Sequence, residues 1–474
     1  MVGPHRLPCE TPAIHRAEAG APSPSPWVLP VTILGSSLGF IDSSVVNVAL
    51  PAMQRGLGTS IATMQWVVNG YMLTLASLIL LGGSMGDRYG RRRIFLIGLT
   101  GFALASLGCG LAPSAAWLIG ARLLQGAAAA LLIPASLAII GAAYEGETRG
   151  PAIGTWAAAG ALTTALGPPL GGWLVDSVGW RAIFFINLPV AATALLLALK
   201  LPADRPAQSP ESLDVGGALL AVLALGLISY GLISLGQGTG QAGVIAITAA
   251  IPVFWLFVRV EARAASPMMP LSLFRNRDFA GANTLTILLY AALSGGLFLL
   301  PFLLIEVHGY SAAAAGAAFL PFSAIMGLGS RWSGGLVERY GARLPLIVGP
   351  SITAAGYTLL AFSGEEPSYW TGFFPGLAII GIGMTLSVAP LTTAVLDSAP
   401  EEKSGTASGI NNAAARAGGL VAVAALGLAV GGGAADLGGD TLLAPYRLVM
   451  FAAAVLAVSS ALIAATTIGA GARS

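Results

Sequence analysis

The residues best suited to chemistry in this chain are Asp42 and Arg122, two charged side chains set within long apolar stretches. A carboxylate in the middle of an apolar helix costs about 2.5 to 3.5 kcal/mol to insert into a membrane, so its presence is itself a functional hypothesis. Because a carboxyl group in such a place can bind and release a proton, we predict that Asp42 is a proton site. A purely structural ion pair with Arg122 is the alternative.

The two residues are predicted to lie at the same depth. Asp42 precedes Pro51, where we expect the first helix to end, and Arg122 follows Ser114, where we expect the fourth helix to begin. At about 1.5 Å per residue, both lie about 12 to 14 Å from the same end of the helices. A deprotonated Asp42 would bind Arg122 or a cationic substrate, and a protonated Asp42 would release either. Proton and substrate would then compete for one charge.

A second group of charged residues forms a short turn between two apolar stretches, in a chain of which only 9% of the residues are charged. The pattern returns 251 residues later with its acid, its Arg-Tyr-Gly and a following arginine, Arg92 and Arg343, in register. Such a repeat predicts that each half of the chain carries the same helix pair. The two copies are Gly83-Ser84-Met85-Gly86-Asp87-Arg88-Tyr89-Gly90-Arg91-Arg92-Arg93 and Gly334-Gly335-Leu336-Val337-Glu338-Arg339-Tyr340-Gly341-Ala342-Arg343.

The elements that must position these residues are membrane-spanning helices. Hydrophobic residues make up 55% of the chain and 63 residues are glycine, a composition that excludes a water-soluble globular protein of 474 residues. A spanning helix needs about 20 mostly apolar residues, and the sequence contains about fourteen such stretches. We therefore predict an all-α polytopic membrane protein with 14 transmembrane helices.

Orientation follows from the basic residues. About eighteen of the 23 Lys and Arg residues fall with the termini and the even-numbered turns. By the positive-inside rule both termini are cytoplasmic, and the protein is predicted in the cytoplasmic membrane. Residues 1–26 are rich in Pro and Ala without an apolar core, so they predict a disordered cytoplasmic tail.

The repeat also predicts how the chain is divided. Gly58-Thr59-Ser60 and Gly309-Tyr310-Ser311 are 251 residues apart, and each places a serine where it can cap the next helix. Direct repetition with like orientation implies two six-helix bundles related by a pseudo-two-fold axis along the membrane normal. We predict bundles at residues 27–200 and 279–474, with a linker at 201–278 that carries an inserted transmembrane hairpin.

At this point the chain resembles the major facilitator superfamily, and within it the fourteen-helix branch of drug/proton antiporters. Besides the charged turn, the similarity rests on Phe40-Ile41-Asp42 to Ala49-Leu50-Pro51, on Arg122-Leu123-Leu124-Gln125-Gly126, and on Gly160 through Gly167-Pro168-Pro169-Leu170-Gly171-Gly172. The resemblance implies a proton-coupled antiporter that exports lipophilic, possibly cationic compounds by alternating access. A proton-coupled transporter of one specific metabolite is the alternative.

The resemblance also implies that the charged turn gates the cytoplasmic side. We expect Asp87 to close that side in the outward-open state, against the helix that opens at Ser404. Contact of the basic side chains with phospholipid is the alternative, above all for Arg92 and Arg93. The predicted gate consists of Gly83, Asp87, Arg88, Gly90, Arg91, Arg92, Glu338 and Arg339.

The fifth helix carries the antiporter signature. Gly160, Gly167 and Gly171 recur at spacings of seven and four, which aligns them on one face and permits close helix contact. Pro168 and Pro169 are expected to kink the helix, and Gly172 follows on the same segment. Ordinary packing of small residues is the alternative.

Sparse polar and aromatic residues on otherwise apolar helices predict a cavity for amphipathic molecules, since a sugar would need denser polar contacts. For Glu306, a place at the outer mouth is the alternative, and for Arg416, a structural role against backbone carbonyls. The candidate cavity residues are Asn47, Trp66, Asn69, Tyr71, Gln125, Tyr290, Glu306, Asn411 and Arg416.

Other function classes find little support. Cys9, Cys109 and three dispersed histidines form no ligand pattern, so no metal and no cofactor are expected. No nucleophile or nucleotide-binding motif indicates an enzyme, and no basic run interleaved with aromatic residues indicates nucleic-acid binding. The predicted partners are a small-molecule substrate, protons and the lipid bilayer, and we expect the protein to act as a monomer.

Overall fold

The computed structural model describes residues 25–202, 213–363, 368–430 and 439–469, so most of the predicted tail lies outside it. This described part is all-helical and contains no strand. Its helices are α1 (Val28–Leu57), α2 (Ile61–Tyr89), α3 (Arg91–Gly110), α4 (Ala115–Ala143), α5 (Arg149–Ser177), α6 (Ala182–Phe185), α7 (Asn187–Ala198), α8 (Val215–Gly236), α9 (Gly240–Glu261), α10 (Arg277–Phe302), α11 (Ala312–Ala317), α12 (Leu320–Tyr340), α13 (Arg343–Ser363), α14 (Phe374–Asp397), α15 (Ser404–Val430) and α16 (Leu443–Thr467).

Twelve helical segments in the described part are long and apolar enough to span a membrane. Two further segments are helical without meeting both criteria: α5, which is 29 residues long, and the shorter apolar stretch Ala182–Ala198. A polytopic all-α membrane protein is therefore confirmed.

The predicted serine caps are confirmed. The Ser60 Oγ accepts a hydrogen bond from the Thr63 N–H at 3.4 Å, and the Ser311 Oγ accepts one from the Ala314 N–H at 3.1 Å. Each side chain accepts from one of the backbone N–H groups that the start of a helix leaves without an i−4 partner. The glycines that precede these caps, Gly58 and Gly309, have φ values of 60° and 68°, a left-handed conformation that favours glycine. The repeat is thus visible in the backbone.

The predicted end of the first helix at Pro51 is wrong. Pro51 lies inside α1, which continues to Leu57 and ends at the left-handed Gly58. A proline in a helix interior costs about 3 kcal/mol, but Leu50 and Met53 beside it are fully buried, and their packing offsets that cost. Asp42 therefore lies farther from the helix end than predicted.

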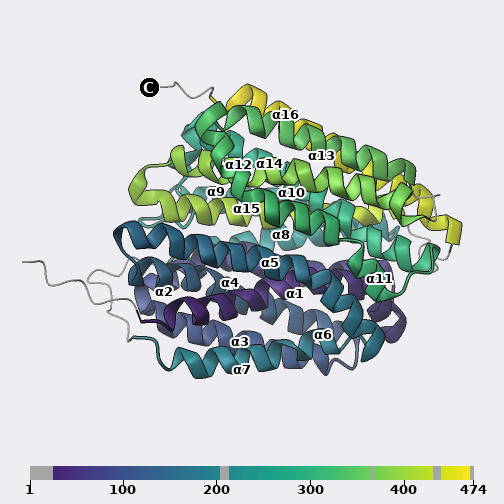
Figure 1. Cartoon of the computed structure of the whole chain (residues 1–474), viewed down its shortest axis with the longest axis horizontal. Helices are drawn as coiled ribbons and strands as arrows, with labels where there is room; N and C mark the ends of the chain where they lie inside the picture. Colours follow the sequence, from purple (N-terminus) through teal and green to yellow (C-terminus); the bar gives the residue numbers. More distant parts are fainter. Residues whose placement is uncertain (1–24, 203–212, 364–367, 431–438, 470–474) are drawn as a thin grey trace, which may run out of the picture.

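The helices form two groups (Figure 1). Helices α1 to α7 pack together in the lower group, and α10 and α12 to α16 in the upper group, while the short α11 lies against α5 where the groups meet. The remaining pair, α8 and α9, pack against each other, and α8 also contacts both α2 and α15. The hairpin that they form therefore lies across the place where the two groups meet.

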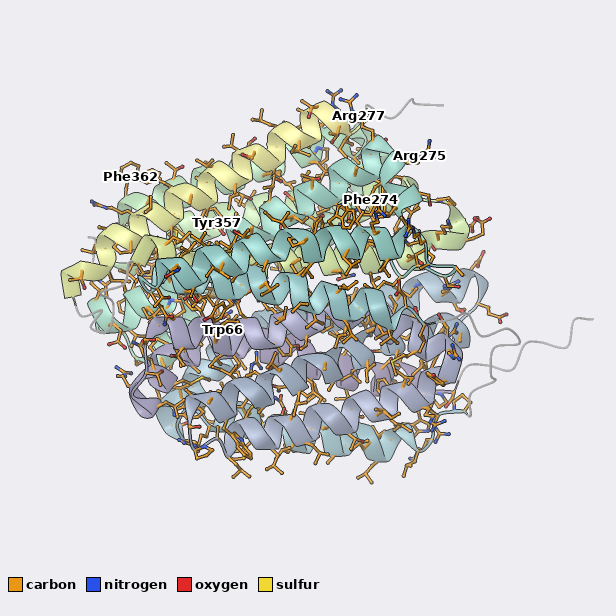
Figure 2. The ribbon with its side chains drawn as sticks, turned by 180° about the vertical axis from the view of Figure 1, so that it is seen from behind. Trp66, Phe274, Arg275, Arg277, Tyr357 and Phe362 are labelled. Carbon is orange, nitrogen blue, oxygen red and sulfur yellow. The ribbon has the colours of Figure 1, made fainter. Side chains whose placement is uncertain are left out.

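The two groups meet along two seams. In the α2–α15 seam, Leu80 lies against Gly409 and Met72 against Gly419. Farther along the same seam, the Gln65 Nε2 donates to the Val423 carbonyl oxygen at 2.7 Å. In the second, the α5–α12 seam, α5 packs against α11 and also contacts α12. Figure 2 shows the molecule from behind, with Trp66 of α2 labelled in the lower group.

The two ends of the helices differ. We call the end at Gly90 and Gly341 the charged-turn end, and the end at Gly58 and Gly309 the opposite end. At the opposite end, the Asp176 carboxylate of α5 accepts hydrogen bonds from the N–H groups of Ala312 and Ala313 at 3.1 and 2.8 Å. A carboxylate at the start of a helix is favoured both by the free N–H groups and by the helix dipole.

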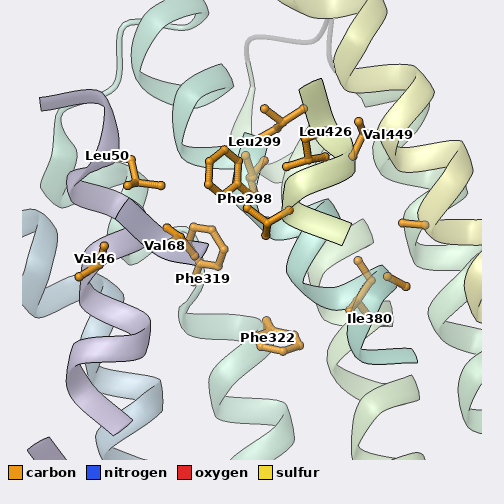
Figure 3. Close-up of a cluster of buried hydrophobic side chains, with 14 of the residues drawn as sticks. Val46, Leu50, Val68, Phe298, Leu299, Phe319, Phe322, Ile380, Leu426 and Val449 are labelled. Atoms are coloured by element: carbon orange, nitrogen blue, oxygen red, sulfur yellow. The ribbon is translucent and has the colours of Figure 1, made fainter. Parts of the chain in front are cut away.

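An apolar cluster also joins the two groups (Figure 3). Val46 and Leu50 of α1 and Val68 of α2 belong to the same buried cluster as Phe298 of α10 and Phe319, which precedes α12. Such residues exclude water, and their burial contributes about 25 cal/mol per Å² of apolar surface. The opposite end is therefore closed.

Candidate functional site

The structure brings the predicted pair together. Arg122 of α4 donates from its Nη1 to the Oδ2 of Asp42 on α1, and both side chains are buried, with 2% and 0% of their surface exposed. The two side chains meet although Asp42 lies farther from the end of α1 than Arg122 lies from the start of α4. Burial removes the water around both charges, and their attraction for each other offsets that cost. Loss of one partner would leave an uncompensated buried charge.

Uncharged polar groups complete the coordination of the pair. The Gln125 Nε2 donates to the Asp42 Oδ1 at 2.9 Å, and the Gln125 Oε1 accepts from the Arg122 Nη1 at 2.8 Å. The Ser106 Oγ accepts from Gln125 at 2.8 Å and from the Asn187 Nδ2 at 3.2 Å. Asn187 also reaches the Asp42 Oδ1 at 3.5 Å. We call Asp42, Arg122, Gln125, Ser106 and Asn187 the buried polar cluster.

Aromatic and backbone groups hold the arginine. Its Nε donates to the Val67 carbonyl oxygen at 3.1 Å, and its guanidinium carbon lies 4.3 Å from the centre of the Tyr71 ring. The Tyr71 hydroxyl in turn donates to the Gly39 carbonyl oxygen at 3.3 Å. A cation over an aromatic face is attracted by the ring, with a gain of about 2 kcal/mol where both are desolvated. Arg122 thus keeps partners that do not depend on Asp42.

This arrangement permits one chemical exchange. Asp42 accepts three hydrogen bonds, from Arg122, Gln125 and Asn187. A proton bound at Asp42 would remove the charge that Arg122 neutralises, and the arginine would retain Val67 and Gln125 as acceptors. Arg122 would then keep hydrogen-bond acceptors, but its buried positive charge would lose its counter-charge.

At the charged-turn end, Asp87 makes an ion pair within its own group. The Arg91 Nη2 lies 3.0 Å from the Asp87 Oδ1, and the Arg91 Nη1 donates to the Ala138 carbonyl oxygen at 3.3 Å. Asp87 lies in the last turn of α2. Gly90 separates α2 from α3, and Arg91 is the first residue of α3. The Arg92 Nη2 donates to the Leu199 carbonyl oxygen at 3.3 Å.

The other predicted gate residues lie on the same end. Gly90 and Gly341 have φ values of 100° and 70°, which matches their place in the two copies of the turn. Arg88 stacks on Tyr89 at 5.5 Å, and Arg339 lies in the last turn of α12. A Cβ on Gly83 would stand 3.9 Å from Pro134 of α4. The side chain of Glu338 lies outside the described part of the chain.

The glycine face of α5 packs tightly, as predicted. A Cβ on Gly160 would overlap Phe40, one on Gly167 would overlap Ser44, and one on Gly171 would overlap Val45, so this face lies against α1. The neighbouring face meets the other group. A Cβ on Gly172 would overlap the Ala312 carbonyl oxygen, and the Pro168 carbonyl oxygen lies directly against Gly316.

The predicted cavity residues do not line one common cavity wall, and four of them lie in three different places. Tyr71 and Gln125 belong to the buried polar cluster and its surroundings rather than to a wall between the groups. Glu306 lies beyond α10 and makes an ion pair with Arg55 at 3.2 Å, which joins the two groups at the opposite end. Trp66 is half-buried and lies seven residues from Leu73, which contacts Gly226 of α8, so it faces the hairpin.

The remaining candidates lie on α1, α2, α10 and α15. Asn69 is fully buried, and both polar atoms of its side chain lack a hydrogen-bond partner in the described structure. Asn411 of α15 donates to the Thr286 Oγ1 at 2.6 Å. Arg416 lies near enough to Tyr71 and Tyr290 for its charge to act on both hydroxyl groups. Asn47 is half-buried on α1.

Comparison with known proteins agrees with this architecture. The family model described as Major Facilitator Superfamily matches residues 32–423. The chain belongs to the Major Facilitator Superfamily. Among other members, the multidrug resistance protein Stp of Mycobacterium tuberculosis (strain CDC 1551 / Oshkosh) is 38% identical over 405 residues, 84% of this chain and 75% of that protein.

Two further members are similar over comparable lengths. The tetracenomycin C resistance and export protein of Streptomyces glaucescens is 36% identical, over 85% of this chain and 76% of that protein. The puromycin resistance protein pur8 of Streptomyces alboniger is 36% identical, over 87% of this chain and 83% of that protein. The superfamily member described here is thus a multi-pass membrane transporter rather than an enzyme.

Solved structures match the fold of this superfamily member. A POT family transporter bound to a thioalcohol-conjugated peptide superposes with a TM-score of 0.69, covering 92% of this chain and 94% of that one at 14% identity. The xylose transporter XylE from E. coli, in a partially occluded inward-open conformation, superposes with a TM-score of 0.64, covering 94% and 99% at 14% identity.

Three residues of the site in this transporter were not predicted from the sequence. Ser106 and Asn187 contribute from α3 and α7, and the Phe184 ring of α6 lies 5.9 Å from the guanidinium carbon of Arg122. Each has 0% or 1% of its surface exposed. Ser106 and Asn187 are single polar residues in apolar stretches, and this was the only feature of the sequence that could have indicated them as site residues. Neither is charged, so neither stands out among the many serines and asparagines of the chain.

Proposed function

We propose that this transporter is a proton-coupled antiporter that exports lipophilic compounds, such as drugs and antibiotics, across the cytoplasmic membrane. Its similarity to multidrug, tetracenomycin C and puromycin resistance proteins supports drug export as the transport activity. The observation that carries proton coupling is the buried Asp42–Arg122 pair, a titratable carboxylate inside the first bundle. The charged-turn end faces the cytoplasm in this proposal, together with both termini.

The proposed architecture has fourteen spans. The twelve segments that meet the length and hydropathy criteria are joined by α5 and by α6 with α7. Residues 27–200 and 279–474 then form the two six-helix bundles, and the hairpin α8–α9 lies in the linker at 201–278. The copies of the charged turn lie on the same side, as the even number of spans between them requires.

Coupling follows from the two charge states of the buried polar cluster. A proton that enters from outside binds Asp42 and releases Arg122 from the ion pair, and a proton that leaves to the cytoplasm restores it. The membrane potential contributes about 2.3 kcal/mol per charge per 100 mV to this step. We propose that substrate is bound in one charge state and released in the other, so that proton entry drives export.

We propose that the structure represents an inward-facing state of the cycle, and the contacts that close the opposite end support this. The Asp176 cap on α11, the Arg55–Glu306 pair and the apolar cluster of Figure 3 all lie at that end. Asp87 pairs with Arg91 of its own bundle. We propose that Asp87 exchanges this partner for the start of α15 when the cytoplasmic side closes, by a movement of its side chain, since Leu80 and Gly409 already hold α2 against α15 nearby.

The test uses proteoliposomes with an imposed pH gradient and an internal pH dye. Lipophilic compounds, neutral antibiotics and sugars are added to wild type, to Asp42→Asn and to the control Asp397→Asn, a carboxylate at the end of α14. We expect proton movement triggered by some lipophilic compounds in wild type and control, and none in Asp42→Asn. Unchanged flux in Asp42→Asn would remove that residue from coupling, and flux triggered by one metabolite alone would favour the specific transporter.

A further inference from the structure

Two carboxyl groups meet at the charged-turn end of the inserted hairpin, outside the buried polar cluster. Asp214 caps α8, with its Oδ1 accepting from the Gly217 N–H at 2.7 Å. Glu261 is the last residue of α9 and is 2% exposed, and its Oε2 accepts from the Met269 N–H at 3.0 Å. Each carboxyl group is therefore fixed by a backbone donor through one oxygen.

The second oxygen of each group has no donor. The Asp214 Oδ2 and the Glu261 Oε1 are both buried without a hydrogen-bond partner in the described structure. Both lie 2.7 Å from the point where a Cβ on Gly217 would stand, so they face each other beside this glycine. Two ionised carboxylates offer acceptors only, and burial of an unpaired acceptor is costly. A single proton between them would satisfy both oxygens.

The surroundings of the pair offer no compensating charge within the described residues. The hairpin base is packed with Ala218, Phe257 and Met268. Where it meets α2, the partners are Leu78, Leu80 and Leu81. The charged group that acts on Glu261 is Asp214.

The nearby basic residues lie away from the Asp214–Glu261 pair. On α9, Arg259 is exposed and stacks on Trp255 at 4.4 Å, and Arg263 is exposed in the segment that follows. On α2, the first charged residues beyond Leu81 are Asp87 and Arg88, more than a turn away. On α15, which also contacts α8, the charge nearest this end is the exposed Lys403 that precedes the helix.

We propose that Asp214 and Glu261 form a second proton-binding site, in which one proton is shared between the two carboxyl groups and fastens the base of the α8–α9 hairpin against α2. Removal of that proton leaves two carboxylates in contact inside an apolar cluster, and their repulsion opens the hairpin base. The site is separate from the coupling pair, so it stands whether or not Asp42 drives transport.

Infrared difference spectroscopy on the full-length protein in lipid nanodiscs tests the shared proton. The variants are Glu261→Gln and Asp214→Asn, and Glu401→Gln removes an exposed carboxylate as the control. We expect wild type and control at about pH 7 to show the C=O stretch of a protonated carboxylic acid that each single variant loses, since either change leaves the remaining carboxylate with an amide donor. Absence of this band from wild type, or its survival in both variants, would overturn the proposal.

Thermal unfolding gives an independent measurement. A carboxyl pair that holds a proton in the folded state alone binds more protons than the unfolded chain, so stability falls as the pH rises. We expect the melting temperature of wild type to fall more steeply than that of Glu261→Gln between about pH 5 and about pH 8, starting above the ordinary range of a free carboxyl group. Asn is a good helix cap, so Asp214→Asn is the second variant. Equal slopes in all three proteins, or stabilisation of wild type alone by Na⁺ over choline, would contradict a shared proton.

Discussion

At the scale of single residues, the site depends on how few charges lie inside the first bundle. Asp42 and Arg122 neutralise each other, and Gln125, Ser106 and Asn187 satisfy the atoms that the pair leaves over. Because each polar atom has a partner, removal of one charge is expected to cost more than removal of both.

We predict that Arg122→Met lowers the free energy of unfolding by about 3 to 5 kcal/mol, since it leaves Asp42 buried and unpaired. The double variant with Asp42→Asn should regain most of that loss. Cys109 is fully buried, so its reaction with a thiol dye on heating reports unfolding once Cys9 is replaced by serine. A double variant as unstable as Arg122→Met would show that the pair is not energetically coupled.

Arg416 has a different electrostatic role. Within the described residues, no hydrogen bond or ion pair reaches its guanidinium group, which lies near Tyr71 and Tyr290. We predict that Arg416→Ala weakens the export of anionic or acceptor-rich compounds by about 10-fold or more, the loss of one charged hydrogen bond, whereas Arg416→Lys retains most of it. Transport assays with matched anionic and cationic dyes measure this. An equal loss for both dyes would indicate a structural role instead.

At the scale of elements, the glycines of α5 determine which helices can touch. Three of them allow α1 to approach, while Gly172 and Gly316 allow backbone contact between α5 and α11. This contact and the Asp176 cap hold the opposite end closed, so bulk at Gly172 acts directly on the conformational equilibrium.

We predict that Gly172→Val opens the opposite end, because overpacking of this kind costs about 1 to 3 kcal/mol in the closed state alone. Gly154→Val is the matched control on the same helix, since a Cβ there meets nothing within 4 Å. The measurement is labelling by an impermeant maleimide of a cysteine placed at Val46, which lies in the apolar cluster of Figure 3. We expect labelling about 10-fold faster in Gly172→Val than in the control. Equal rates would show that the α5–α11 contact does not limit opening.

Much of this was predictable from the sequence, where charge and repetition gave strong signals. The ion pair, the serine caps and the tight α5 packing follow from residue type and spacing. The end of α1 did not, because the packing of Leu50 and Met53 outweighs the local effect of Pro51. The contribution of Asn187 and the contact between Asp214 and Glu261 depend on segments far apart along the chain, whose approach no local pattern indicates.

At the scale of the whole molecule, the α2–α15 seam is packed from Gln65 to Leu80, whereas the α5–α12 seam is held at one end by α11. We therefore expect the two bundles to rotate about the α2–α15 seam and to separate along the α5–α12 seam.

We predict that a disulfide between Leu80→Cys and Gly409→Cys leaves transport largely intact, because these positions stay together during the motion. A disulfide between Gly172→Cys and Ala312→Cys should abolish transport until it is reduced. Counterflow assays in proteoliposomes, with and without reductant and in a Cys9→Ser background, measure both. Loss of transport on crosslinking the first pair would mean that the α2–α15 seam also separates.

The position of the α8–α9 hairpin has a further consequence for compounds that dissolve in the bilayer. Because α8 covers the α2–α15 seam and α9 turns Phe254, Trp255 and Leu256 outward, that flank is shielded from the lipid. A hydrophobic molecule that enters laterally from a leaflet is therefore expected to pass between α5 and α12 rather than between α2 and α15. Photoreactive lipophilic probes should accordingly label α5 and α12 more than α2 and α15. The hairpin thus exposes the two flanks of the transporter to the membrane unequally.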